Sequence, residues 1–248
     1  IVTDITSAEA VFSLMGPKSR SLLEAITSEE LSNEKFPFGT AKEIEIGMGL
    51  ARAHRISYVG ELGWELYIPT DMAKHVFDTI IQNGSDKGLQ LCGMHVLDSC
   101  RLEKAYRHFG HDITDEDHVL EAGLGFCVKL NKRVDKFGHF IGRDAVLAKK
   151  DKGLERRLLQ FKLRDRMPLL YHNETIYRDG TSVGRITSGG FGHYLGASVG
   201  LGYVPCQRGE TVEQLLNSDY EIDIAGTRVK ADASFRPFYD PLNEKVKL

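Results

Sequence analysis

Residues 55–66 read Arg55-Ile56-Ser57-Tyr58-Val59-Gly60-Glu61-Leu62-Gly63-Trp64-Glu65-Leu66, and this stretch carries the strongest indication of both fold and function. Two predicted strands, Leu50 to Tyr58 and Trp64 to Ile68, flank a turn in which two glycines bracket Glu61. Glycine permits a tight turn and lets a ligand approach the backbone closely, so the carboxylate can point into a cleft. An exposed glutamate at a hairpin tip is the alternative, and this stretch by itself does not exclude it.

Helices and strands are predicted on both sides of this stretch. Apolar or alternating runs predict strands over 10–15 and 42–47. Helical spacing predicts one helix after Pro17, a second from its cap at Thr70 to Gly84, and a third from about Gly93 to Tyr106. These elements do not repeat as regular β-α units, which favours the α+β class over a doubly wound sheet.

The pattern changes after about Gly153. Short apolar runs such as 157–163, 182–187 and 199–204 are separated by turn residues, which predicts a small all-β domain, most simply a barrel. The charged stretch 149–153 is the natural boundary. We therefore predict a first domain over residues 1–150 and a β-barrel domain over residues 151–248.

Composition excludes several classes of protein. A formal net charge of -3 argues against a protein built mainly to hold nucleic acid, and no apolar run approaches the roughly 18 residues that span a bilayer. The four cysteines form no Cys-x-x-Cys pair and are predicted to be buried, reduced thiols. The His and Asp residues between His108 and His118 match no standard metal-ligand spacing, so no metal site is predicted.

Two glycine-rich segments resemble catalytic motifs by chance. Gly196-Ala197-Ser198-Val199-Gly200 matches G-x-S-x-G, but its serine leads directly into a predicted strand rather than a helix. Gly189-Gly190-Phe191-Gly192 lacks the third spaced glycine and the lysine of a phosphate-binding loop, and we interpret it as a β-turn.

Six short blocks follow one another along the chain and together identify a family. They are Val59-Gly60-Glu61-Leu62-Gly63, Asp98-Ser99-Cys100-Arg101-Leu102-Glu103, Gly110-His111-Asp112-Ile113, Leu120-Glu121-Ala122-Gly123-Leu124, Ile186-Thr187-Ser188-Gly189-Gly190 and Gly202-Tyr203-Val204-Pro205. In this order and spacing they resemble the aminomethyltransferase family, which includes the glycine cleavage T-protein. The fuller runs 59–66, 103–108 and 237–247 resemble the C-terminal region of sarcosine and dimethylglycine dehydrogenases.

The resemblance implies an α+β fold: an aminomethyltransferase-type, folate-binding domain followed by a small C-terminal β-barrel. It also implies tetrahydrofolate as the cofactor. Glu61 would accept the paired N–H groups of the pterin, and Tyr58 would pack against the ring or bond to its edge. Arg101 would hold a carboxylate of the glutamate tail, and the alternative is an i,i+3 pair with Asp98 or another ion pair on the helix surface.

Three other residues of these segments are expected to have structural roles. Asp112 and Glu121 are expected to fix loop geometry, and Trp64 to pack in the core. No catalytic residue is assigned.

In the dehydrogenase branch, an upstream FAD domain oxidises an N-methylamine, and folate captures the carbon as 5,10-methylenetetrahydrofolate. This chain has no plausible FAD fingerprint, so such a domain would be its partner, without nucleic acid or membrane. The family's important acidic residue in an early strand lies upstream of Ile1, so we expect the chain to be part of a longer protein. The implied compartment is a mitochondrial matrix or a bacterial cytoplasm.

Two other functions stay open at this point. A free-standing aminomethyltransferase would work with a lipoyl carrier protein, and the Trp64 and Tyr106-Arg107-His108 features disfavour it. A non-catalytic regulatory subunit, like the one related to these dehydrogenases in the pyruvate dehydrogenase phosphatase, is the second. The retention of Glu61 and Arg101 favours folate binding over that role. The sequence does not indicate which amine is the substrate or how the chain oligomerises.

Overall fold

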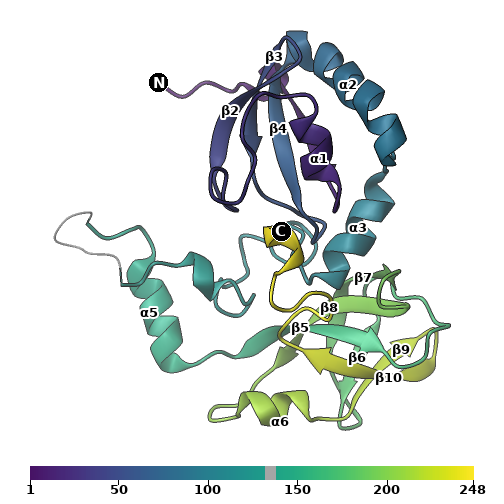
Figure 1. Ribbon diagram of the computed structural model, residues 1–248. Coiled ribbons are helices and arrows are strands. Elements are labelled where there is room, and N and C mark those ends of the chain that lie inside the picture. The colour runs from purple at the N-terminus through teal and green to yellow at the C-terminus, as the bar shows by residue number, and fades with distance from the viewer. Residues whose placement is uncertain (132–137) are drawn as a thin grey trace. The chain divides into compact units, whose positions relative to one another are not determined.

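The computed structural model describes residues 1–131 and 138–248, which divide into two compact units. The first unit comprises Ile1–Cys100 together with Leu242–Leu248, and the second comprises Arg101–Pro241. Both contain helices and strands, so the predicted α+β class is confirmed (Figure 1). The predicted domain boundary after residue 150 stays a prediction.

The first unit is built on a four-stranded antiparallel sheet in the spatial order β1-β4-β3-β2. Its strands are β1 (Glu9–Met15), β2 (Ala41–Ile46), β3 (Gly49–His54) and β4 (Gly63–Pro69). Exposure alternates along β2 and β3, as the period of two requires for a sheet with one covered face. Buried side chains of that face include Ile44, Ala51 and Leu66.

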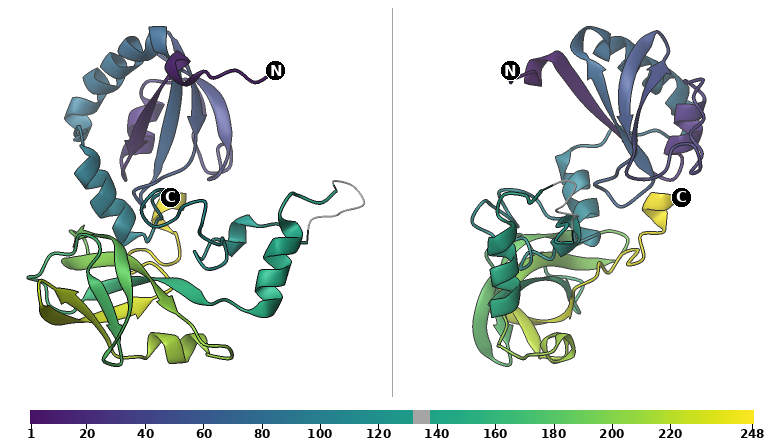
Figure 2. Two further views of the ribbon diagram at one scale, coloured as in Figure 1. Left: turned by 180° about the vertical axis from the view of Figure 1, so that it is seen from behind. Right: turned by 90° about the vertical axis from the view of Figure 1, so that its left-hand side faces the viewer.

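Two helices, α1 (Ser19–Glu24) and α2 (Thr70–Gly84), pack on the sheet and close the core of the first unit (Figure 2). Val76 and Ile80 of α2 point into this core, as their spacing predicts. The predicted cap at Thr70 is wrong. Pro69 occupies the N-cap position without a side-chain cap, and the Thr70 hydroxyl donates instead to the Ser7 carbonyl over 2.8 Å.

The strand predicted over Leu50 to Tyr58 is shorter than expected. β3 ends at His54, so Tyr58 lies in the connection to β4 rather than in the sheet. The pairing becomes irregular at Arg55, whose N–H bonds to the Thr40 carbonyl while its own carbonyl accepts from the Gly39 N–H, and the Ile56 N–H turns back to the His54 carbonyl. The backbone therefore leaves the sheet before Tyr58.

The third predicted helix is α3 (Met94–Glu103), which ends three residues before Tyr106. Ala105 takes the left-handed conformation with φ 52°, and the N–H groups of Ala105 and Tyr106 bond to the Leu102 and Arg101 carbonyls. This is the Schellman arrangement, which usually places glycine at the left-handed position. Because alanine occupies it here, no glycine marks the end of this helix in the sequence.

The second unit continues with a largely irregular segment and then a closed barrel. Among its described residues, the further helices are a short 3₁₀ helix (Gly125–Cys127), α5 (Arg143–Lys152) and α6 (Val212–Leu216). The barrel has the strand order β10-β5-β8-β7-β6-β9. Its strands are β5 (Arg156–Leu163), β6 (Thr175–Arg178), β7 (Thr181–Gly192), β8 (Ala197–Pro205), β9 (Tyr220–Ile224) and β10 (Thr227–Ser234).

The barrel confirms the predicted C-terminal architecture, and its interior is a separate apolar core. Phe161, Ile186 and Ile222 are among its fully buried members. Ser198 lies within β8 rather than at a turn from a strand into a helix, as expected for a chance G-x-S-x-G match. The turn predicted at Gly189–Gly192 is wrong, because these residues form the end of β7. A Cβ at Gly189 would lie 2.7 Å from the Tyr171 carbonyl oxygen, so glycine serves close packing there.

Three features expected from the sequence concern membrane-spanning helices, metal sites and the burial of cysteines. None of their helices is long and apolar enough to cross a membrane. In residues 1–131 and 138–248, no group of three His, Cys, Asp or Glu side chains is arranged to hold a metal ion. The predicted burial of the cysteines is wrong: Cys92 and Cys127 are exposed, and Cys100 and Cys206 are half-buried.

Candidate functional site

The connection between β3 and β4 holds Tyr58 and Glu61, two of the three residues predicted to bind a ligand. The glycines on either side of Glu61 have different tasks. Gly60 adopts φ 80°, which side chains disfavour. Gly63 lies against β1, where a Cβ would be 2.6 Å from the Met15 Cγ atom. The first glycine therefore makes the turn, and the second lets it sit close to the sheet.

Both ends of this connection are anchored within the first unit. Before the turn, the fully buried Arg55 side chain donates to Asn33 Oδ1 over 2.6 Å and to the Phe36 carbonyl over 2.9 Å. After it, the Leu62 carbonyl accepts hydrogen bonds from the Gly16 N–H at 2.7 Å and from the Ser19 hydroxyl at 3.1 Å. Fixed ends hold the turn in one place, although Tyr58 and Glu61 are only half-buried.

Trp64 packs in the hydrophobic core next to this turn, as predicted. Its side chain is fully buried, with the Phe36 ring 6.2 Å and the Arg55 guanidinium 5.3 Å from its own ring. Burial also lowers the pKa of Arg55 to about 10, with a further lowering from the nearby charge of Arg20. Trp64 therefore supports the turn from below, and it is a core residue.

Arg101, the third predicted binding residue, lies at the end of α3 in the second unit. Its side chain is 3% exposed, and its guanidinium forms an ion pair with Asp112 over 2.7 Å. It also donates to the Ser188 hydroxyl at 3.0 Å and to the Tyr106 carbonyl at 3.2 Å. Arg101 is thus buried rather than on the helix surface, and its role in ligand binding stays a prediction.

Asp112 organises the loop that follows α3. Besides Arg101, its carboxylate accepts hydrogen bonds from the His108 N–H at 2.9 Å and from the Thr187 hydroxyl on β7. A fully buried carboxylate requires several such partners, because an unpaired one would cost several kcal/mol. One side chain thus ties the helix end and the loop to the barrel, which agrees with the expected role in loop geometry.

Sequence reasoning assigned no role to Glu103 or Lys104, which are both buried. Glu103 accepts hydrogen bonds from the Tyr194 and Leu195 N–H groups at 2.8 and 2.9 Å. Lys104 pairs with Asp240 over 3.1 Å and also donates to its carbonyl. The available signal in the sequence was that these two charged residues directly follow Leu102, which is buried at the helix end. They hold α3 against the barrel and against the segment that follows it.

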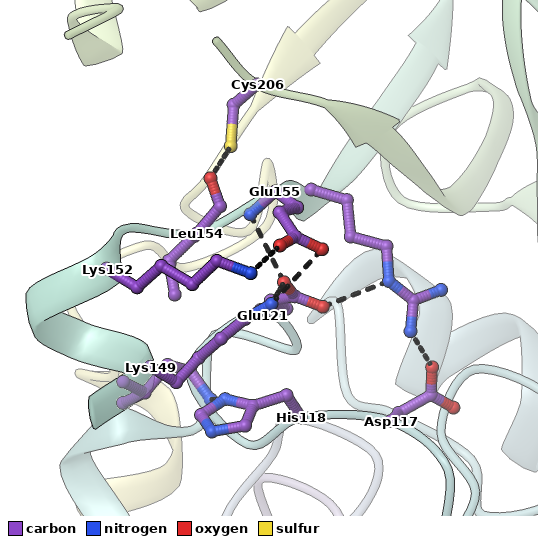
Figure 3. Close-up of polar contacts among 10 residues, drawn as sticks. Asp117, His118, Glu121, Lys149, Lys152, Leu154, Glu155 and Cys206 are labelled. Atoms are coloured by element: carbon purple, nitrogen blue, oxygen red, sulfur yellow. Dashed lines mark hydrogen bonds and ion pairs between the residues drawn. The ribbon is translucent and has the colours of Figure 1, made fainter. Parts of the chain in front are cut away.

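Glu121 is the centre of a second polar cluster in the second unit (Figure 3). Its carboxylate bonds with Lys149 of α5 at 2.9 Å, with Arg156 of β5 at 3.0 Å and with the Glu155 N–H at 3.2 Å. Burial acts to raise the pKa of Glu121, but the hydrogen bonds from Lys149 and Arg156 outweigh it and the pKa is lowered. Glu121 therefore fixes the loop to the start of the barrel, as expected.

Family comparison identifies both parts of the chain. Residues 1–132 match the GCVT N-terminal domain, and residues 156–240 match the glycine cleavage T-protein C-terminal barrel domain. The chain belongs to the glycine cleavage T-protein family. This confirms the resemblance and the predicted combination of an aminomethyltransferase domain with a C-terminal barrel.

Relatives of this T-protein family chain are enzymes of two kinds. The 4-methylaminobutanoate oxidase (formaldehyde-forming) of Paenarthrobacter nicotinovorans is 42% identical over 99% of the chain, and human mitochondrial sarcosine dehydrogenase is 36% identical over 96%. The chain spans only 29% and 26% of those proteins. An aminomethyltransferase of Halothermothrix orenii is 39% identical over 79% of the chain, which spans 52% of that relative.

A solved T-protein has the same fold. The crystal structure of glycine cleavage system aminomethyltransferase T from Bartonella henselae matches with a TM-score of 0.77 and 25% identity, covering 94% of this chain and 60% of that one. This chain is thus an aminomethyltransferase-type chain related to both groups of enzymes. Its structure places Tyr58 and Glu61 in the first unit and Arg101 in the second, and their roles in ligand binding stay predictions.

Proposed function

We propose that this chain is the tetrahydrofolate-binding, one-carbon-transfer module of an enzyme resembling sarcosine or dimethylglycine dehydrogenase. In this function an FAD-dependent domain oxidises an N-methylamine, and the carbon is captured as 5,10-methylenetetrahydrofolate. The relationship to 4-methylaminobutanoate oxidase and sarcosine dehydrogenase over nearly the whole chain supports this branch. The long additional regions of those relatives leave room for a separate oxidising domain.

The observation that carries the proposal is the anchored glycine turn with Glu61 at its centre. A pterin presents an amino group and a ring N–H side by side, and a carboxylate can accept both in a charge-assisted pair. The turn suits this acceptor role, because Gly60 adopts a left-handed backbone, Gly63 packs closely on β1, and the Glu61 carboxylate between them is half-buried. Tyr58, in the same connection, would contact the ring.

Arg101 would bind a carboxylate of the folate tail. A guanidinium has five N–H donors in a planar fork, which suits a carboxylate. Asp112 and Ser188 hold this plane in one orientation. Asp112 would then act as a positioning residue for Arg101 rather than as a contact to the ligand.

Bound tetrahydrofolate would supply the amine nitrogens that accept the one-carbon unit. The chain's own residues would bind and orient it: Glu61 at the pterin, Tyr58 at the ring and Arg101 at the tail. Such positioning is a large part of catalysis when the acceptor is itself a good nucleophile. No residue is assigned to proton transfer.

Calorimetric titration of 5-formyltetrahydrofolate into the chain tests this function directly. We expect the parent chain to bind and Glu61→Gln to lose about 2 kcal/mol, roughly thirtyfold in affinity, because a charge-assisted pair is replaced by an amide. The matched control is Glu45→Gln, which removes an exposed carboxylate of β2 in the same unit and should leave affinity unchanged. A folded parent that does not bind, or equal affinities for all three proteins, would refute the proposal.

A further inference from the structure

A small cavity in the second unit lies where the start of β5 meets the turn before α6. Its volume is about 180 Å³, below the roughly 300–1,000 Å³ of pockets that hold drug-sized ligands. It therefore suits a molecule of only a few heavy atoms and is too small for a folate. Arg157 of β5, Cys206, Arg208 and Phe235 are among the residues that line it. None of the proposed folate-binding residues belongs to this lining.

Glu210 brings a negative charge to the cavity lining, but a cation outside the lining compensates it. Its carboxylate forms a close ion pair with Arg178 of β6, and its second oxygen accepts the Gln207 N–H at 3.1 Å. The pKa of Glu210 is lowered, chiefly by the hydrogen bond from Arg178, so the carboxylate stays ionised. Because both of its oxygens are occupied, Glu210 does not neutralise the arginines of the cavity.

Arg157 is half-buried, and its neighbours in the cavity are uncharged. Its guanidinium lies 5.3 Å from the centre of the Phe235 ring. It also hydrogen-bonds with the Cys206 thiol, which itself donates to the Leu154 carbonyl over 3.0 Å (Figure 3). Burial raises the pKa of this thiol more than Arg157 lowers it. The sulfur therefore stays protonated and supplies no negative charge to Arg157.

Arg208 adds a second positive charge from the turn before α6. Within residues 1–131 and 138–248, neither it nor Arg157 forms an ion pair with a carboxylate. The Glu210–Arg178 pair sums to zero, so the two guanidinium groups give the cavity a net positive charge. A cation that has lost part of its contact with water is stabilised by a nearby counter-ion. The cavity therefore favours an anion.

The other walls of the cavity decide which kind of anion fits. Leu154, Val212, Leu215 and the Phe235 ring are apolar, and Val212 is 51% exposed, so it offers an uncovered apolar surface. A guanidinium fork matches the planar oxygens of a carboxylate. Apolar walls beside it favour an anion with a short hydrocarbon group, because that group gains by leaving water and an inorganic phosphate does not.

We propose that this cavity binds a short aliphatic monocarboxylate, whose carboxylate contacts Arg157 and whose hydrocarbon end packs on Phe235 and Val212. Arg208, which is exposed, adds a longer-range attraction for the anion. The site shares no residue with the turn that carries Glu61, and the proposal does not depend on folate binding.

The test uses butyrate as the probe, with butyramide as its uncharged isostere, titrated into the whole chain by calorimetry. We expect butyrate to bind, butyramide not to bind, and Arg157→Gln to weaken butyrate by at least about tenfold, the effect of losing a charge-assisted contact. Arg208→Gln should weaken it by roughly threefold, because this charge is exposed. Arg166→Gln, which removes an exposed arginine outside the cavity lining, is the matched control and should bind as the parent does.

A second pair of variants keeps both arginines and therefore does not depend on the folding of Arg157→Gln. Val212→Glu places a carboxylate in the cavity lining at the first residue of α6, where an acidic side chain is also favourable to a helix. We expect it to abolish butyrate binding. Val212→Gln, which has a similar size and no charge, is the matched control and should bind within about threefold of the parent, as for a neutral change at an exposed position.

Hydrogen exchange then locates the bound butyrate, and we expect protection in residues 206–216. Several results would overturn the proposal: no binding of butyrate at about 20 mM, near the weak limit of specific sites, equal binding of butyramide, or tighter binding of inorganic phosphate than of butyrate. Unchanged affinity in folded Arg157→Gln and Val212→Glu, or protection confined to other segments, would also overturn it.

Discussion

Replacing Asp112 with asparagine removes the charge that faces Arg101 inside the second unit. The ion pair is 2.7 Å long, and the two side chains are 3% and 0% exposed. Removing one partner of such a pair leaves the other charge buried and uncompensated, which costs about 3–5 kcal/mol. The Thr187 hydroxyl and the His108 N–H also lose part of their acceptor. Since domains are stable by only about 5–15 kcal/mol, this is a large fraction of the total.

Urea denaturation followed by circular dichroism measures this loss. The matched control is Asp232→Asn, whose pair with Arg164 has side chains that are 41% and 63% exposed. An exposed pair contributes about 0–1 kcal/mol, so the control should unfold close to the parent. In thermal melts the Tm of the Asp112→Asn variant should be lower than that of the parent by about 10 °C, because each kcal/mol lowers Tm by roughly 3 °C for a unit of this size.

A double variant separates the ion pair from general disruption. Arg101→Met combined with Asp112→Asn should lose clearly less stability than the two single losses added together, because the second change removes the unpaired charge left by the first. The reasoning is refuted if Asp112→Asn stays within about 1 kcal/mol of the parent, or if the two losses simply add.

Three further predictions concern other parts of the chain. Gly63→Ala should cost about 1–3 kcal/mol, because the new Cβ would lie 2.6 Å from a β1 side chain, whereas Gly93→Ala, with nothing within 4 Å, should be nearly neutral in urea melts. Trp64→Ala should cost about 3–5 kcal/mol and Met48→Ala, 82% exposed, less than about 0.5. The pKa of Glu121 is lowered when folded, so its stabilising effect is complete above pH 4.5 and lost as the pH falls through the folded value. Acid titration of stability should therefore be steeper for the parent than for Glu121→Gln.

Local patterns predicted most of the elements. The alternation of charged and apolar residues predicted β2, and the helical spacing of Val76 and Ile80 predicted α2. Both patterns arise because burying one face of an element makes its apolar residues recur at a regular spacing. The barrel followed from short apolar runs between turn residues. Boundaries were harder: the pairing of β3 becomes irregular at Arg55, whose carbonyl accepts from the Gly39 N–H, and a pattern within one strand carries no record of that partner.

The same distinction between local patterns and long-range contacts applies to the candidate site residues. Glu61 was found because its flanking glycines are a local feature, and one of them does require a left-handed backbone. Arg101 was found through the family blocks, but its burial and its bonds to Asp112 and Ser188 were not, because those residues lie 11 and 87 positions away in the chain.

The sequence by itself determined the family, the class of fold and the residues that repeat at the spacing of a strand or helix. Only the tertiary structure decided which charges are buried and which are held in ion pairs. Glu121 and Arg157 are both charged residues beside apolar ones in the sequence, yet one is fully paired and the other lines a cavity. The physical reason is that charge compensation depends on distances between atoms, and those distances are set by packing between segments far apart in the chain.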